Sequence, residues 1–333
     1  MGNRPLLAFP CASYNAHIAA LHCFPAYTRK RKLFLIAMQM AVRTGVSSRL
    51  WKTVFSPLSV IDASVLTTWL ETLSEQLHKP CLYPVFVWPA DAERGRVYIH
   101  LLDQSGNRVA FVKLALDQSN IDLIQNEKSV LRQLNTARWP NVRVPKVLGE
   151  GMIQGCCYLM VESAPQQAKT IDRKNTLVID EIISVYAGEP WRMPMVEVEK
   201  LMWWQCFMGQ TQFDSKLFQT IKDVALDGVD VCRVHGDLNQ TNILLTGEEV
   251  WLLDWERSCK AAPYLTDAIC AEVDLLWPIT QKNIALAFNR FRAVHWDNQG
   301  LKYRHGVLLA LAFLHAADFT PATAMLEYWH TAE

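Results

Sequence analysis

Asp237, Asn242 and Asp254 are the residues whose types and spacing point most directly to chemistry. The last two flank a pair of apolar runs, residues 243–245 and 250–253, which are separated by a polar turn. Such a pattern predicts an antiparallel hairpin, in which Asn242 and Asp254 emerge close together at the open end. An amide oxygen and a carboxylate in one place are suitable ligands for a hard divalent cation such as Mg²⁺. We therefore predict that Asn242 and Asp254 bind a metal ion.

Asp237 precedes Asn242 by five residues, on a loop that leads into the same end of the hairpin. Its carboxylate has two candidate roles: a third oxygen ligand, or a base that orients an attacking hydroxyl and accepts its proton. Phosphoryl transfer requires both a metal ion on the phosphates and a base at the nucleophile. We assign the role of base to Asp237. An ordinary capping role in a tight loop is the alternative interpretation.

The sequence His-Gly-Asp-Leu-Asn-Gln-Thr-Asn at 235–242, with Leu-Asp-Trp-Glu at 253–256, resembles the aminoglycoside phosphotransferase and choline kinase-like family. The resemblance covers about residues 81–275. It implies a protein-kinase-like α+β fold and transfer of a phosphoryl group from ATP to a small molecule. It also matches Pro263 and Asp267 with a following Pro-x-x-x-Asp element, whose aspartate is usually structural.

The resemblance also implies a lysine on the third strand, paired with a glutamate of the next helix. Lys113 lies in an apolar strand, residues 110–116, where a buried charge is costly without a purpose. Glu127 falls on the apolar stripe of a helix predicted over about 120–135. Its simplest partner is Lys113, whose ammonium group is then aimed at nucleotide phosphates. The alternative is that both charges reach solvent at the edges of their elements.

The small-lobe nucleotide site departs from the kinase pattern in one loop. Residues 89–95 contain one glycine and two acids, so they do not form a G-x-G-x-x-G phosphate-binding loop. By resemblance, the adenine ring is expected against the segment after the fifth strand, with Val161 and Ser163 as contacts. ATP is the expected donor and GTP the alternative. Because this loop is atypical, a catalytically weak nucleotide-binding regulatory or scaffold protein is the second hypothesis.

The pattern of apolar residues divides the chain into a strand-rich and a helix-rich part. Helical spacing over 61–77 is followed by five strand-like segments, and helical periodicity dominates from about 177 to 317. The strands are expected at 83–88, 96–102, 108–116, 144–148 and 157–161. We therefore predict a bilobal fold with a cleft between the lobes for ATP and Mg²⁺. The five-stranded antiparallel small lobe with its preceding helix spans 59–163, and the mainly helical large lobe spans 164–333.

Residues 1–58 are irregular in pattern and are interpreted as an N-terminal extension. Within them, four basic residues at 29–32 precede an apolar run that is shorter than the roughly 20 residues of a membrane-spanning helix. Three interpretations are open: a surface helix with a basic start, leader residues upstream of a start at Met38 or Met40, or a basic amphipathic helix on an anionic membrane. In the third, residues 29–55 contact the inner face of a membrane.

Composition limits the class of protein. The chain has 33 basic and 33 acidic residues, and this balance argues against a nucleic-acid-binding protein. Half of the residues are apolar, which is enough for a substantial core. The nine cysteines form no Cys-x-x-Cys pair and are typical of reduced thiols. A cytoplasmic globular protein is expected.

The acceptor is expected to be a small molecule. Only eight residues separate Asp254 from Pro263, too few for the long activation segment of a protein kinase. Residues 255–333 carry eight acidic and seven basic side chains, and this near balance does not favour a polycationic aminoglycoside. A hydroxyl group of a sugar, an amino alcohol or a glycan is the expected acceptor.

Overall fold

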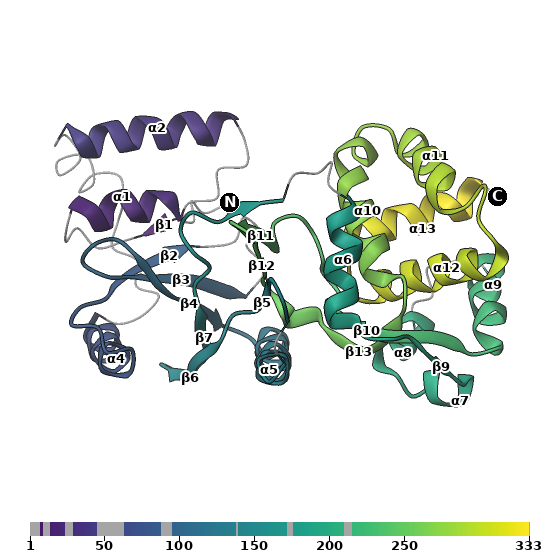
Figure 1. Cartoon of the computed structure of the whole chain (residues 1–333), viewed down its shortest axis with the longest axis horizontal. Coiled ribbons are helices and arrows are strands. Elements are labelled where there is room, and N and C mark those ends of the chain that lie inside the picture. Colours follow the sequence, from purple (N-terminus) through teal and green to yellow (C-terminus); the bar gives the residue numbers. More distant parts are fainter. Residues whose placement is uncertain are drawn as a thin grey trace. The chain divides into compact units, whose positions relative to one another are not determined.

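The chain divides into two compact units in a computed structural model (Figure 1). The first unit contains Met1–Thr136 and Pro145–Ala168, and the second contains Ala137–Val144 and Lys169–Glu333. The structure describes residues 7–8, 14–23, 29–44, 63–87, 95–137, 139–171, 176–209 and 215–332. Within these ranges, no helix combines the length and the apolar character needed to cross a membrane.

An antiparallel sheet forms the centre of the first unit, with the strand order β1-β2-β3-β4-β7-β6 (Figure 1). Its five long strands are β2 (Tyr83–Val87), β3 (Arg96–Leu102), β4 (Arg108–Ala115), β6 (Val147–Ile153) and β7 (Cys156–Glu162). The predicted five-stranded sheet is therefore confirmed, and the short β1 (Leu7–Ala8) extends it beside β2. β6 begins three residues later than predicted, after Pro145, which has no N–H group to donate to a strand.

Two helices of the first unit were predicted from apolar spacing and are confirmed. Trp69 and Leu73 of α4 (Ala63–Gln76) are buried against the sheet residues Ile99 and Val112. The second helix, α5 (Gln118–Leu134), begins where the Asp117 carboxylate accepts the backbone N–H of Asn120 at 2.9 Å. Such a cap satisfies one of the unpaired N–H groups at the start of a helix.

The N-terminal extension also packs into the first unit. It contains α1 (Tyr14–His22) and α2 (Arg29–Arg43), and α1 lies between α2 and the sheet (Figure 1). At the β3–β4 turn, Gly106 has a φ of +83°, and a Cβ atom there would lie 2.8 Å from the backbone oxygen of Asn15. Arg108 Nη2 donates to the backbone oxygen of His22 at 3.0 Å, at the end of α1. The basic run begins the helix α2, as both the surface-helix and the amphipathic-helix interpretations predicted.

The second unit is mainly helical, as predicted. Its longest helix is α12 (Leu301–Ala316), in which every residue from 307 to 315 is buried. A helix that is apolar on all sides belongs in a core, and α12 contacts five other helices of the unit. The other described helices of the unit are α6 (Thr176–Ala187), α7 (Met195–Val198), α8 (Met202–Gly209), α9 (Ser215–Leu226), α10 (Thr266–Thr280), α11 (Ile284–His295) and α13 (Thr320–Ala332).

Two small sheets of the second unit carry the segments that the sequence singled out. One has the order β13-β10-β9 and consists of β9 (Trp191–Met193), β10 (Val229–Val234) and β13 (Cys259–Pro263). The other has the order β5-β12-β11-β8 and consists of β5 (Val142–Arg143), β8 (Lys169–Thr170), β11 (Ile243–Thr246) and β12 (Glu249–Leu252). The loop from β10 to β11 contains the His-Gly-Asp sequence.

Candidate active site

The β11–β12 hairpin has the register predicted from the sequence. Leu244 pairs with Trp251 and Leu245 with Val250. Beyond the last strand pair, the N–H group of Leu253 donates to the backbone oxygen of Asn242 at 2.9 Å. Asn242 and the residue after Leu253, which is Asp254, therefore lie at the same open end of the hairpin.

Asp237 lies in the loop that enters this hairpin, where two amide side chains hold it. Asn239 Nδ2 donates to Asp237 Oδ1 at 2.9 Å. Asn242 Nδ2 donates to the backbone oxygen of Asp237 at 2.9 Å and to its Oδ2 at 3.3 Å. Because the amide nitrogen of Asn242 is directed at Asp237, its Oδ1 is the atom with which it can bind a cation.

The electrostatic environment of Asp237 is unfavourable to its charge. Burial raises the pKa of its carboxyl group above the ordinary value, and the negative charge of Asp254 raises it further. The hydrogen bond from Asn239 opposes this shift. Two carboxylates that repel each other while partly desolvated are stabilised by a divalent cation. The oxygen atoms of Asp254 and Asn242 are of the type that Mg²⁺ prefers, so this set of donors fits Mg²⁺.

His235 joins the Asp237 loop to the end of β12 from inside the unit. Its ring is fully buried, with Nε2 at 2.8 Å from the backbone oxygen of Leu253. Its Nδ1 accepts the backbone N–H of Asp237 at 3.3 Å. A carbonyl oxygen only accepts and an N–H group only donates, so these partners define a neutral imidazole with its proton on Nε2. No role of its own is predicted for His235 from the sequence.

Asp267, at the start of α10, holds the same loop from the other side. Its two carboxylate oxygens accept the backbone N–H groups of His235 at 2.7 Å and Gly236 at 2.9 Å. The hydroxyl group of Tyr186 donates to it at 2.6 Å. Asp267 is only 1 % exposed, so these three donors compensate a charge that is removed from water. This is the structural role that the resemblance implied.

Two backbone conformations at the candidate site are unusual. Gly236 has a φ of +82°, and a Cβ atom there would lie 2.2 Å from the backbone oxygen of Arg257. The position therefore requires glycine. Asp254 has a φ of 64° and a ψ of 61°, a left-handed conformation that residues other than glycine seldom adopt. Strained residues of this kind tend to lie at functional sites, where the surrounding structure holds them.

In the first unit, Lys113 and Glu127 form the predicted ion pair. Lys113 Nζ lies 2.6 Å from Glu127 Oε2, and both side chains are buried. Lys113 is on β4, while Glu127 is on α5 among the apolar residues Ile124, Val130 and Leu131. The edge-of-element alternative is therefore wrong.

Breaking this pair from one side is expected to be costly. Glu127→Ala leaves the Lys113 charge buried without its carboxylate, which should lower the free energy of unfolding by about 3–5 kcal/mol. The double variant Lys113→Met/Glu127→Leu removes both charges and should be much less destabilised. Urea unfolding measures the free energy of unfolding of both variants. The control is Lys128→Ala in the partly exposed pair of Lys128 and Glu150, where we expect a loss below about 1 kcal/mol. Equal losses for Glu127→Ala and Lys128→Ala would contradict the prediction.

The predicted adenine contacts lie at the end of β7. Val161 is buried and pairs with Phe111 and Val147 in the neighbouring strands. The hydroxyl group of Ser163 is buried and makes no hydrogen bond with another described residue. A ligand that accepts or donates a hydrogen bond here would satisfy this hydroxyl group. In the atypical loop at 89–95, residues 89–94 lie outside the described residues.

Comparisons with known proteins give a result only at the level of structure. No protein-family model and no curated protein sequence matches the chain. Among solved structures, a thermostable mutant of the aminoglycoside phosphotransferase APH(4)-Ia is similar to 78 % of this chain and 96 % of its own length, with 15 % identity and a TM-score of 0.48. A GDP complex of aminoglycoside 2'-phosphotransferase-IIIa matches 81 % of this chain and 99 % of its own, with 12 % identity and a TM-score of 0.47.

A third similar structure is a putative fructosamine-3-kinase from Haemophilus somnus 129PT. It matches 78 % of this chain and 94 % of its own length, with 13 % identity and a TM-score of 0.45. Aminoglycoside phosphotransferases are the family that the sequence around Asp237 resembles.

Proposed function

We propose that this chain is an ATP-dependent phosphotransferase that acts on a hydroxyl group of a small molecule, such as a sugar, an amino alcohol or a glycan. The observation that carries the proposal is the partly buried Asp237 carboxylate, held by Asn239 and Asn242 at the hairpin end where Asp254 emerges. A capping role alone does not account for this group. A capping carboxylate is stabilised in its charged form, whereas burial and the negative charge of Asp254 raise the pKa of Asp237.

In the proposed reaction, Asp237 orients the acceptor hydroxyl group and accepts its proton on a carboxylate oxygen. The acceptor oxygen forms a bond to the γ-phosphorus as the bond to the bridging oxygen breaks, and ADP leaves. Burial, the largest cause of the raised pKa of Asp237, favours proton acceptance by its carboxylate. Asn242 and Asp254 are the residues that would hold Mg²⁺, which when bound neutralises phosphate charge.

The first unit supplies the nucleotide contacts in this proposal. Lys113 binds phosphate oxygens, and Glu127 positions its ammonium group through the 2.6 Å ion pair. Val161 and Ser163 contact the adenine ring, for which the buried hydroxyl group of Ser163 offers a hydrogen bond. These roles explain why two opposite charges are buried together in an otherwise apolar layer.

Thermal unfolding with and without Mg²⁺ and ATP tests the nucleotide site first. At about 100 times its dissociation constant, ATP should stabilise the folded chain by about 2.7 kcal/mol. The shift should require Mg²⁺ and should be lost in Asp254→Ala. It should persist in the control Asp223→Ala, which changes an exposed carboxylate on α9. The absence of a shift with either ATP or GTP would contradict the proposal.

A screen for ADP formation with sugars, amino alcohols and glycans then tests the reaction. A thermal shift that depends on nucleotide, together with ADP formation in the presence of at least one acceptor, supports phosphotransferase activity. A shift without ADP formation from any acceptor class would favour the catalytically weak regulatory or scaffold protein instead.

A further inference from the structure

The balanced net charge of the chain conceals a strong asymmetry. Residues 1–61 contain eight lysine and arginine residues and no aspartate or glutamate. Because the whole chain has 33 residues of each sign, the remainder carries an excess of eight acidic residues. Half of the N-terminal positive charge is in the run Arg29-Lys30-Arg31-Lys32, which forms the first turn of α2. The net positive charge of the chain is thus concentrated in its N-terminal sequence.

The helix α2 also exposes a row of large apolar side chains. Leu33, Ile36 and Met40 are 67 %, 52 % and 63 % exposed, and their spacing of three and four residues places them on one face. Leu35 and Val42, which lie elsewhere around the helix, pack into a cluster with α1 and β-strand residues. One face therefore anchors α2 to the first unit, while an apolar row faces solvent. Grouped exposed apolar residues are typical of an interaction surface.

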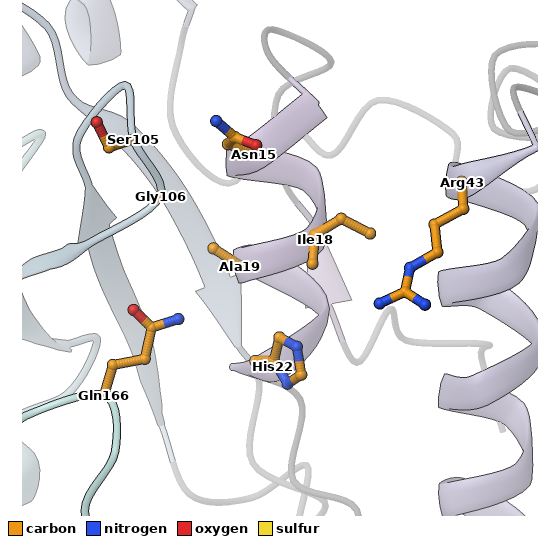
Figure 2. Close-up of a pocket in the computed structure, with 8 residues that line it drawn as sticks. All are labelled: Asn15, Ile18, Ala19, His22, Arg43, Ser105, Gly106 and Gln166. Carbon is orange, nitrogen blue, oxygen red and sulfur yellow. The ribbon is translucent and has the colours of Figure 1, made fainter.

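The surroundings of α2 are positive as well. A hollow of about 300 Å³ lies beside it, lined by α1, the β3–β4 turn and Gln166 (Figure 2). Figure 2 shows Arg43 of α2 and His22 of α1 at this hollow. The other lining residues are Asn15, Ile18, Ala19, Ser105 and Gly106, so no carboxylate of the described residues lines it. An anion that approaches α2 consequently meets donors and positive charge.

We propose that α2 docks on the surface of an anionic membrane. Its apolar row inserts at the boundary between headgroups and acyl chains, and the basic run contacts lipid phosphates. A lipid surface matches both properties, whereas a nucleic acid would satisfy only the charge. Contact with the same face of a second copy would bring two positive regions together. The proposal is independent of the phosphotransferase activity, because it uses none of the residues assigned to that reaction.

Co-sedimentation of the full chain with vesicles tests the proposal. We expect binding to phosphatidylcholine vesicles that contain about 30 % phosphatidylserine, and little binding to pure phosphatidylcholine. Binding should weaken steeply between low and physiological salt, since the charges act within a Debye length of the surface. Equal binding to both kinds of vesicle, or none to the anionic one at low salt, would overturn the proposal.

Matched variants distinguish binding through this surface of α2 from nonspecific hydrophobic binding to vesicles. Leu33→Asn/Ile36→Asn/Met40→Asn should weaken vesicle binding at least about tenfold. All three side chains are exposed, so the fold should be unaffected. The control triple, Met202→Asn/Leu226→Asn/Leu301→Asn, changes side chains that are 66 % to 73 % exposed on the second unit and should bind as the wild type does. A loss in both triples would overturn the proposal. The proposal would also be overturned if the wild type were a dimer, the first triple variant were a monomer, and both bound vesicles equally well.

A pair of charge variants tests the electrostatic part. Lys30→Gln/Lys32→Gln should weaken binding to anionic vesicles about thirtyfold, because each basic residue near the surface contributes about fivefold. Lys216→Gln/Lys282→Gln removes the same charge from the second unit and should have little effect. Equal weakening in both variants would mean that net charge alone governs binding, which would overturn the assignment to α2.

Discussion

Replacing Asp237 by asparagine is expected to reduce phosphoryl transfer by about 10²- to 10⁴-fold, the usual contribution of a general base. Asparagine has the same shape but cannot accept the proton of the acceptor hydroxyl group. Its side-chain oxygen can still accept the hydrogen bond from Asn239, and Asn242 keeps its bond to the backbone oxygen at 2.9 Å. Only the longer side-chain contact from Asn242, at 3.3 Å, is lost, so the loop should keep its conformation. The substitution also removes one of two carboxylates that raise each other's energy, so the unfolding midpoint should be unchanged or higher.

The measurement is kcat/KM with an acceptor found by the screen, beside the unfolding midpoint and the ATP-dependent thermal shift. Asp223→Asn, an exposed change on α9, should leave all three at their wild-type values. A wild-type rate in Asp237→Asn would refute the role as base. Loss of the Mg²⁺-dependent shift together with the rate would instead identify Asp237 as a metal ligand, the second role that its position suggested.

Replacing Asp267 by asparagine is expected to lower the free energy of unfolding by about 3 kcal/mol or more. The carboxylate accepts two backbone N–H groups, one on each oxygen. Asparagine places an NH₂ group where one of these oxygens was, so a donor would face the N–H of His235 or Gly236. Activity should fall as well, because these hydrogen bonds hold the residues immediately before Asp237.

Tyr186→Phe is the matched comparison for this prediction. It removes one of the three donors to Asp267 and leaves the two backbone contacts, so we expect a loss of only about 1–2 kcal/mol. Burial and the charge of Asp267 raise the pKa of Tyr186 well above its ordinary value, so its hydroxyl group remains a donor throughout the accessible pH range. Urea unfolding and kcat/KM measure both variants. A cost for Asp267→Asn no greater than that for Tyr186→Phe would show that the backbone contacts contribute little.

Local sequence determined the parts of this protein whose geometry follows from periodicity. The β11–β12 register was predictable because a short polar turn between two apolar runs fixes which residues face each other. The Lys113–Glu127 pair was predictable for a related reason. A charge in an apolar strand and a charge on the apolar stripe of a helix are each costly alone, so they stabilise each other.

Only the tertiary structure decided how the Asp237 loop is held. Asp267 lies 30 residues from Asp237 in the sequence, and no local pattern shows that its oxygens meet the N–H groups of His235 and Gly236. The need for glycine at 236 arises in the same way, because the obstructing oxygen belongs to Arg257. Likewise, the pattern of residues 1–58 did not show that α1 packs on the sheet and α2 on α1. Periodicity describes which face of an element is apolar, whereas contacts between distant segments depend on how those faces combine in the folded chain.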